Sequence, residues 1–143
     1  MDYLSAFQIS ASGMALEKLR LDTVAMNLAN ANVSAKNASE TYRPLRVISN
    51  VPIDSTFNKI LLKQQINPQG VTAFSVQPDN VEPKLVYDPS HPHADDKGYV
   101  AYPNINTVSE MVTMLQALRT YDANVAAMNA AKSMANRALE IGR

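Results

Sequence analysis

The stretch TVSEMVTMLQALRTYDANVAAMNAAKSMANRALEI, residues 107–141, decides the fold of this chain. It contains no proline, a residue that costs about 3 kcal/mol inside a helix, and Gly142 follows it as a helix stop. The stretch therefore predicts one helix of about 35 residues, about 50 Å long, which exceeds the span of a small domain. At its start, Thr107 and Glu110 have the spacing of a capping box, in which each side chain accepts a hydrogen bond from the other residue's backbone amide.

Apolar residues follow the a and d positions of a heptad repeat along this helix. They form a narrow stripe, which is typical of a coiled coil rather than of a globular helix with a wider apolar face. Lys132 is the one interruption of the stripe. The a and d residues are Met111, Met114, Leu118, Tyr121, Val125, Met128, Ala135 and Leu139.

A second helix is predicted over residues 3–32, with Asp2 as its N-cap. It has the same seven-residue period, carried by Phe7, Met14, Leu21 and Leu28. Gly13 lies inside this helix, where glycine costs about 1 kcal/mol relative to alanine. Two interpretations stay open: a tolerated surface glycine, or a position where another helix approaches closely.

The middle of the chain differs in kind, because all eight prolines lie between Pro44 and Pro103. Runs rich in β-branched and aromatic residues alternate there with turn-forming segments, which predicts about four short strands. Residues 54–66 are ambiguous between a strand and a short helix. Residues 33–41 are small and polar, which predicts a linker or a mobile loop.

These elements predict an α+β protein, in which long N- and C-terminal helices form a coiled-coil layer and a small antiparallel β module lies between them in sequence. The predicted helical domain comprises residues 1–40 and 104–143, and the β-rich domain residues 41–103. Neither helix can bury its apolar stripe alone, so some apolar surface is left for other chains. We therefore expect the isolated protein to be partly unfolded at both ends and to order on assembly.

Composition excludes several classes of function. The chain has 143 residues, a formal net charge of +0 and no cysteine, so neither a nucleic-acid-binding basic excess nor a disulfide or thiolate site is present. No apolar run approaches the roughly 20 residues that span a bilayer. The first ten residues, MDYLSAFQIS, lack the features of a cleaved signal peptide.

The best candidate for chemistry is DPSHPHADD, residues 88–96. His91 and His93, with the neighbouring carboxylates, could form a metal-binding module or a hydrolytic site, because imidazole and carboxylate ligate divalent metals. The alternative is a solvated turn stiffened by proline. Nucleophile-elbow and phosphate-cradling motifs are both missing, so we predict neither an enzyme nor a cofactor.

The stretch SASGMALEKLRLDTVAMNLANANVS, residues 10–34, closely resembles the N-terminal signature of the bacterial flagellar axial proteins, the rod and hook family. Residues 85–104 and 98–143 resemble the proximal rod members of that family. One departure is Asn32-Val33-Ser34, where the family usually has Asn-Thr-Thr or a similar triplet. The residues that match the signature are Ser12, Gly13, Leu21, Asp22, Asn27, Leu28, Ala29, Asn30, Ala31 and Asn32.

The resemblance implies a structural subunit of the proximal rod of the flagellar basal body. Such subunits polymerise through their terminal helices into a hollow drive shaft that transmits torque and conducts export. It further implies passage through the flagellar type III export apparatus without a cleaved signal, and a place in the periplasmic rod. The implied partners are further copies of the chain, other rod proteins, and the MS-ring and rod-base proteins. A free-standing coiled-coil adaptor is the alternative that the residues alone leave open, and another axial subunit, such as a different proximal rod protein, is the alternative within the family.

The predicted subunit interface combines the family signature with the heptad positions. Asparagines within it can fix the register between subunits by hydrogen bonding, since polar seam residues specify partners. Asn27, Asn30 and Asn32 are the candidates on the first helix, with Asn124, Asn129 and Asn136 opposite; the alternative is that the first three only fray a helix end. The full set is Gly13, Met14, Leu21, Asp22, Asn27, Leu28, Asn30, Asn32, Met111, Met114, Leu118, Tyr121, Asn124, Val125, Met128, Asn129 and Leu139.

Overall fold

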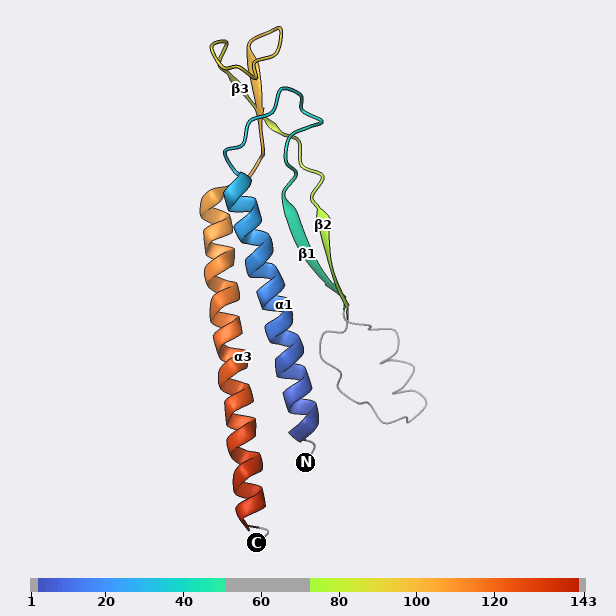
Figure 1. Ribbon diagram of the computed structural model, residues 1–143, viewed down its shortest axis with the longest axis vertical. Coiled ribbons are helices and arrows are strands. Elements are labelled where there is room, and N and C mark those ends of the chain that lie inside the picture. The colour runs from blue at the N-terminus through green and yellow to red at the C-terminus, as the bar shows by residue number, and fades with distance from the viewer. Residues whose placement is uncertain (1–2, 51–72, 142–143) are drawn as a thin grey trace, which may run out of the picture. The chain divides into compact units, whose positions relative to one another are not determined.

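A computed structural model describes residues 3–50 and 73–141 of the chain. The elements follow in the order α1 (Tyr3–Asn30), β1 (Leu45–Asn50), β2 (Ala73–Pro78), β3 (Lys84–Tyr87), β4 (Tyr99–Tyr102) and α3 (Thr107–Ile141), as Figure 1 shows. The predicted α+β class is confirmed, as are both long helices and the four strands. The ambiguous segment 54–66 lies outside the described residues.

The start of α3 differs from the predicted capping box. The side-chain Oδ1 of Asn106, not Thr107, accepts hydrogen bonds from the backbone amides of Val108 (3.1 Å) and Ser109 (3.2 Å). Asn106 is therefore the N-cap, a position that asparagine favours strongly. The capping-box prediction is wrong because the Glu110 carboxylate turns to other partners, on α1 and β1.

Two compact units divide the chain. Unit 1 contains residues 1–19, 48–75 and 117–143, and unit 2 contains residues 20–47 and 76–116. Each unit thus combines parts of both long helices with strand residues, whereas the predicted domains followed the type of secondary structure.

The strands form two separate two-stranded sheets, β1–β2 and β3–β4. β3 and β4 are antiparallel, in a register that pairs Lys84 with Tyr102 and Tyr87 with Tyr99. On its other edge, β4 forms a bridge with Ala35, through backbone hydrogen bonds of 2.9 and 3.3 Å between Ala35 and Ala101. The predicted linker 33–41 is therefore fixed to the β3–β4 sheet of unit 2, and Thr41 at its end is buried.

The seven-residue period of both helices is present, but the buried line is not the predicted apolar line. The buried residues include Ser10, Glu17 and Val24 on α1, Ala31 directly after it, and Glu110, Ala117 and Ala131 on α3. Small and polar side chains therefore face the interior together with Leu16 and Val24. Three of the predicted apolar residues on α3, Met111, Leu118 and Leu139, remain 58%, 46% and 72% exposed.

Candidate functional site

The most deeply buried polar group of unit 2 is the side chain of Asn27, near the end of α1, which is 0% exposed. Its Nδ2 donates hydrogen bonds to the carbonyl of Leu45 (3.0 Å) and to Oε2 of Glu110 (3.1 Å). Its Oδ1 accepts hydrogen bonds from the amide of Leu45 (2.9 Å) and from the hydroxyl of Tyr42 (3.0 Å). These four bonds use both donors and both lone pairs of the amide, so the buried group has no unsatisfied hydrogen-bonding capacity.

Glu110 continues this network from α3 to β1. The residue is 2% exposed, and its Oε1 accepts a hydrogen bond of 2.8 Å from Nη1 of Arg46. The Arg46 side chain is half-exposed and also lies 3.6 Å from the Asp79 carboxylate, measured from Nε. A buried carboxylate is tolerated when it is paired and hydrogen-bonded, and Glu110 meets both conditions.

Tyr42, in the segment between α1 and β1, is the remaining hydrogen-bond partner of the Asn27 side chain. Burial raises the pKa of its phenol above the ordinary value of 10.0, and the negative charge of Glu110 raises it further. Both effects favour the neutral hydroxyl, which is the form that donates to Asn27. Among the residues that the structure describes, every buried side-chain nitrogen and oxygen has a hydrogen-bond partner.

Unit 1 contains a close contact between the two helices at Gly13. A Cβ atom added to Gly13 would lie 2.9 Å from Nδ2 of Asn124, and 3.1 Å from its Cγ and Oδ1. Asn124 therefore occupies the space that a side chain on α1 would take. Of the two interpretations of Gly13, the structure supports the close approach of another helix, here α3 of the same chain.

An outward apolar face lies on the part of α3 that belongs to unit 2. Val108, Met111, Val112 and Leu115 are 68%, 58%, 48% and 56% exposed. At about 100° per residue, these four fall within about 100° of the helix surface, opposite the buried Glu110. We call this set the α3 outward face.

The predicted interface residues fall into three groups by exposure. Asn27 is buried, and its four hydrogen bonds all end within its own chain. Asn30 is half-buried and donates to the Met26 carbonyl one turn earlier. The other half-buried members are Gly13, Met14, Leu21, Leu28, Met114, Tyr121, Asn124, Val125 and Met128. The exposed members are Asp22, Asn32, Met111, Leu118, Asn129 and Leu139.

The loop that carries His91 and His93 has the geometry of a structural turn. Two hydrogen bonds from Ser90 hold the pKa of the Asp88 carboxyl below its ordinary range. The Nδ1 atoms of the histidines are already occupied, that of His91 by the backbone amide of His93 and that of His93 by Ser34. Within residues 3–50 and 73–141, no three His, Cys, Asp or Glu residues converge as a metal site would require.

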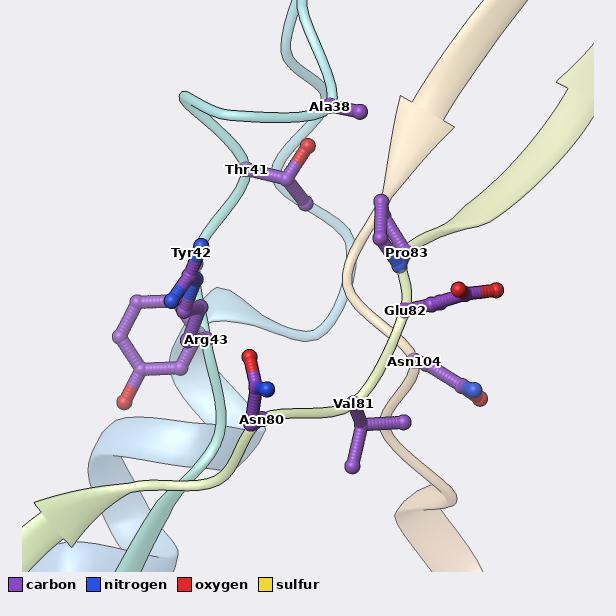
Figure 2. Close-up of a pocket in the computed structure, with 9 residues that line it drawn as sticks. All are labelled: Ala38, Thr41, Tyr42, Arg43, Asn80, Val81, Glu82, Pro83 and Asn104. Carbon is purple, nitrogen blue, oxygen red and sulfur yellow. The ribbon is translucent and has the colours of Figure 1, made fainter.

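Unit 2 also has an open groove of about 270 Å³. Figure 2 shows Tyr42 and Arg43 on one side of it and the run from Asn80 to Glu82 on the other. Arg43 and Glu82 supply its only charges, and none of its lining residues is a histidine or is paired as a nucleophile with a base. The groove therefore carries no recognisable catalytic set.

Comparison of the sequence with known proteins finds two family matches and several relatives. The family "Flagella basal body rod protein" matches residues 7–34, and "Flagellar basal body rod FlgEFG protein C-terminal" matches residues 96–141. The flagellar basal-body rod protein FlgC of Bacillus subtilis (strain 168) is 36% identical over 150 aligned positions, covering 100% of both chains. The chain belongs to the FlgC family.

FlgC proteins of Borreliella burgdorferi and Salmonella typhimurium are also 36% identical, and each comparison covers at least 98% of both chains. The two matched segments contain both ends of the Asn27–Glu110 hydrogen bond, and both Gly13 and Asn124. The remaining network residues, Tyr42, Leu45 and Arg46, lie between the matched segments. In the part of the chain that is described, no helix is long and apolar enough to traverse a bilayer.

Sequence reasoning missed four members of the Asn27 network, namely Tyr42, Leu45, Arg46, and Glu110 in its buried role. The sequence carries one signal for the network, which is Asn27 itself. Asparagine is a poor helix former, so its presence inside α1 indicates that its side chain has hydrogen-bond partners. Nothing in the sequence identifies those partners, which lie 15 to 83 residues away along the chain.

Proposed function

We propose that the chain is a structural subunit of the flagellar basal-body rod that assembles with other basal-body components. Membership of the FlgC family supports the location, and the α3 outward face supports the mode of action. The outward face is the observation that carries the proposal, because monomeric proteins seldom leave a continuous apolar helix face uncovered. A catalytic role has no comparable support, since neither the groove nor the histidine loop gathers a reactive set of side chains.

The finer form of the proposal concerns how the subunits join. We propose that the chain polymerises through its terminal helices into the proximal part of the rod, a hollow shaft that transmits torque and conducts export. Residues 41–103 would lie outside the helical layer. Further copies, other rod proteins and the MS-ring and rod-base proteins would be the neighbours. Export through the flagellar type III apparatus without a cleaved signal, and a periplasmic location, belong to the same proposal.

The exposed apolar residues of α3 give this assembly its driving force. Full burial of a Val, Leu or Met side chain contributes about 1.5–3 kcal/mol, so covering a half-exposed one contributes roughly 1 kcal/mol. The four residues of the α3 outward face would then contribute roughly 4 kcal/mol per subunit before the entropic costs of association. In this proposal, exposed polar residues such as Asn32 and Asn129 set the register between subunits, whereas Asn27 acts inside the subunit.

Substitution of Leu118 tests the proposal. Leu118 is 46% exposed, so Leu118→Asp should leave the fold of the chain intact while placing a charge on an intersubunit contact. We expect loss of rod assembly and motility in cells that still export the variant. The matched control is Ala127→Asp, an exposed position about 180° around the same helix at about 100° per residue.

Sedimentation of the purified variants with other rod proteins, and swimming of complemented cells, are the two measurements. Normal swimming with Leu118→Asp would reject this helix as the contact surface. Failure to find the protein in purified basal bodies would instead favour the free-standing adaptor.

A further inference from the structure

The hydrogen bonds of Asn27 have the form of a strand pairing. Its side-chain amide donates to the carbonyl of Leu45 and accepts from the amide of the same residue, at 3.0 and 2.9 Å. A neighbouring strand would satisfy the first residue of β1 in the same way, through one N–H and one C=O group. Asn27 thus takes the place of a peptide group at the beginning of β1.

Few side chains could replace asparagine at this position. Only Asn and Gln carry a donor and an acceptor on one planar amide, and Gln is one methylene longer. Aspartate and serine lack the pair of N–H donors that reaches both Leu45 and Glu110. Because Asn27 is fully buried, water cannot supply a missing bond.

The orientation of this amide is set by its other two partners. The Glu110 carboxylate accepts hydrogen bonds only, so it draws Nδ2 towards α3 at 3.1 Å. The Tyr42 hydroxyl donates to the other end of the amide, Oδ1, at 3.0 Å. A flipped amide would direct its oxygen at the carboxylate, and Arg46 holds that carboxylate in place at 2.8 Å.

We infer that Asn27 is a positioning residue that fixes the start of β1 against the ends of α1 and α3 in unit 2, and that Glu110 orients it. Residues 31–44 are the covalent connection between α1 and β1, and the Asn27 hydrogen bonds add a direct non-covalent attachment between the two elements. The Asn27 bonds therefore make the placement of β1 conditional on both helices being folded. This role goes beyond rod membership, because it concerns the internal geometry of the subunit.

Hydrogen exchange at the Leu45 amide of the full chain tests this inference. We expect Asn27→Asp to accelerate that exchange about tenfold or more, which corresponds to about 1.4 kcal/mol. The carboxylate that this substitution introduces would face both the Leu45 carbonyl and Glu110, and neither can donate a hydrogen bond to it. The matched control is Asn30→Ala, in the same helix, since the Asn30 side chain donates to the carbonyl of Met26 on α1 itself and not to β1.

The double variant Asn27→Asp with Glu110→Gln distinguishes positioning from a general loss of stability. It carries the native net charge, and the new amide at position 110 can donate to the new carboxylate at position 27. The hydrogen bond between α1 and α3 is then restored with reversed polarity. We expect the double variant to recover part of the Leu45 protection that Asn27→Asp loses.

A single variant keeps the test decisive if Asn27→Asp does not fold. Glu110→Gln alone then carries the test, because a neutral partner releases the orientation of the Asn27 amide and should also lower Leu45 protection.

Three results would overturn the inference. They are rapid Leu45 exchange in the native chain, equal acceleration by Asn30→Ala, and unchanged protection in both Asn27→Asp and Glu110→Gln. Assembly is not measured here, so the outcome is independent of the test of rod function.

Discussion

The contact between Gly13 and Asn124 allows one substitution to be predicted in both sign and size. Gly13→Ala places a methyl carbon 2.9 Å from Nδ2 of Asn124 and 3.1 Å from its Cγ, where carbon contacts normally need about 3.5–4.0 Å. Either the Asn124 side chain leaves its rotamer or the helices separate locally. Overpacking of this kind typically costs about 1–3 kcal/mol.

A second effect opposes the first. Alanine is a better helix former than glycine by about 1 kcal/mol, and Gly13 lies inside α1. The net expectation for Gly13→Ala is therefore a loss of about 0–2 kcal/mol in the free energy of unfolding. In an Asn124→Ala background the three crowding atoms are gone, and the same substitution should then stabilise the chain by about 1 kcal/mol.

A double-mutant cycle measures this reversal of sign. The four chains are unfolded in urea, with helical circular dichroism as the signal, and the coupling between positions 13 and 124 should be about 1–3 kcal/mol. If Gly13→Ala raises stability equally in both backgrounds, the helices do not approach closely at Gly13. The glycine would then be an ordinary surface residue, and the reasoning from the close contact would be refuted.

The remaining predictions concern unit 2 and the C-terminal helix. Glu110→Ala should cost roughly 1–3 kcal/mol of unfolding free energy in urea titrations, because it leaves a buried donor of its α1 partner unsatisfied; a loss below about 0.5 kcal/mol would contradict the network. The raised pKa of Tyr42 means that its contribution is fully present below about pH 10 and is lost as the pH rises through the folded-state value, so Tyr42→Phe should flatten the alkaline decline in stability. An identical decline in both chains would assign it to another group. Leu118→Asp should abolish assembly without changing the helical content, measured by sedimentation and circular dichroism, and a variant that unfolds would place Leu118 in the core instead. Replacing His91 and His93 together by alanine should leave motility unchanged, and loss of swimming with loss of a bound divalent metal would reinstate the metal-binding interpretation.

The apolar pattern of the two helices predicted their positions in the chain but not their buried residues. Absence of proline and a seven-residue repeat were enough to predict α1 and α3 and nearly all of their bounds. The repeat did not predict which line of residues the chain buries. Two lines with the same period exist on α3, and the buried one carries Glu110 and Ala117 while Met111 and Leu118 remain exposed. A hydropathy pattern favours the larger apolar residues, whereas close helix approach selects small ones.

The candidate site was predictable only in part. The signature around Asn27 and the need of Gly13 for an explanation were visible in the residues, and the family resemblance followed from the same stretch. The sequence predicts Asn27 as an intersubunit residue, whereas in the structure its hydrogen bonds join it to Leu45 and Glu110. Both partners are far from Asn27 in the chain, so only the fold identifies them. Glu110 shows the same limit, since a capping box and a buried ion pair require the same residue at the same position.

The sequence by itself determined the two long helices and four short strands of residues 3–50 and 73–141, and the family to which the chain belongs. These features are local, and they follow from proline placement, side-chain periodicity and short motifs. The tertiary structure alone decided which residues the helices bury and which partners complete the buried amide of Asn27. Both depend on contacts between residues far apart in the chain. The sequence offers several residues that could make each contact, and the distance and orientation of the folded segments decide which of them does.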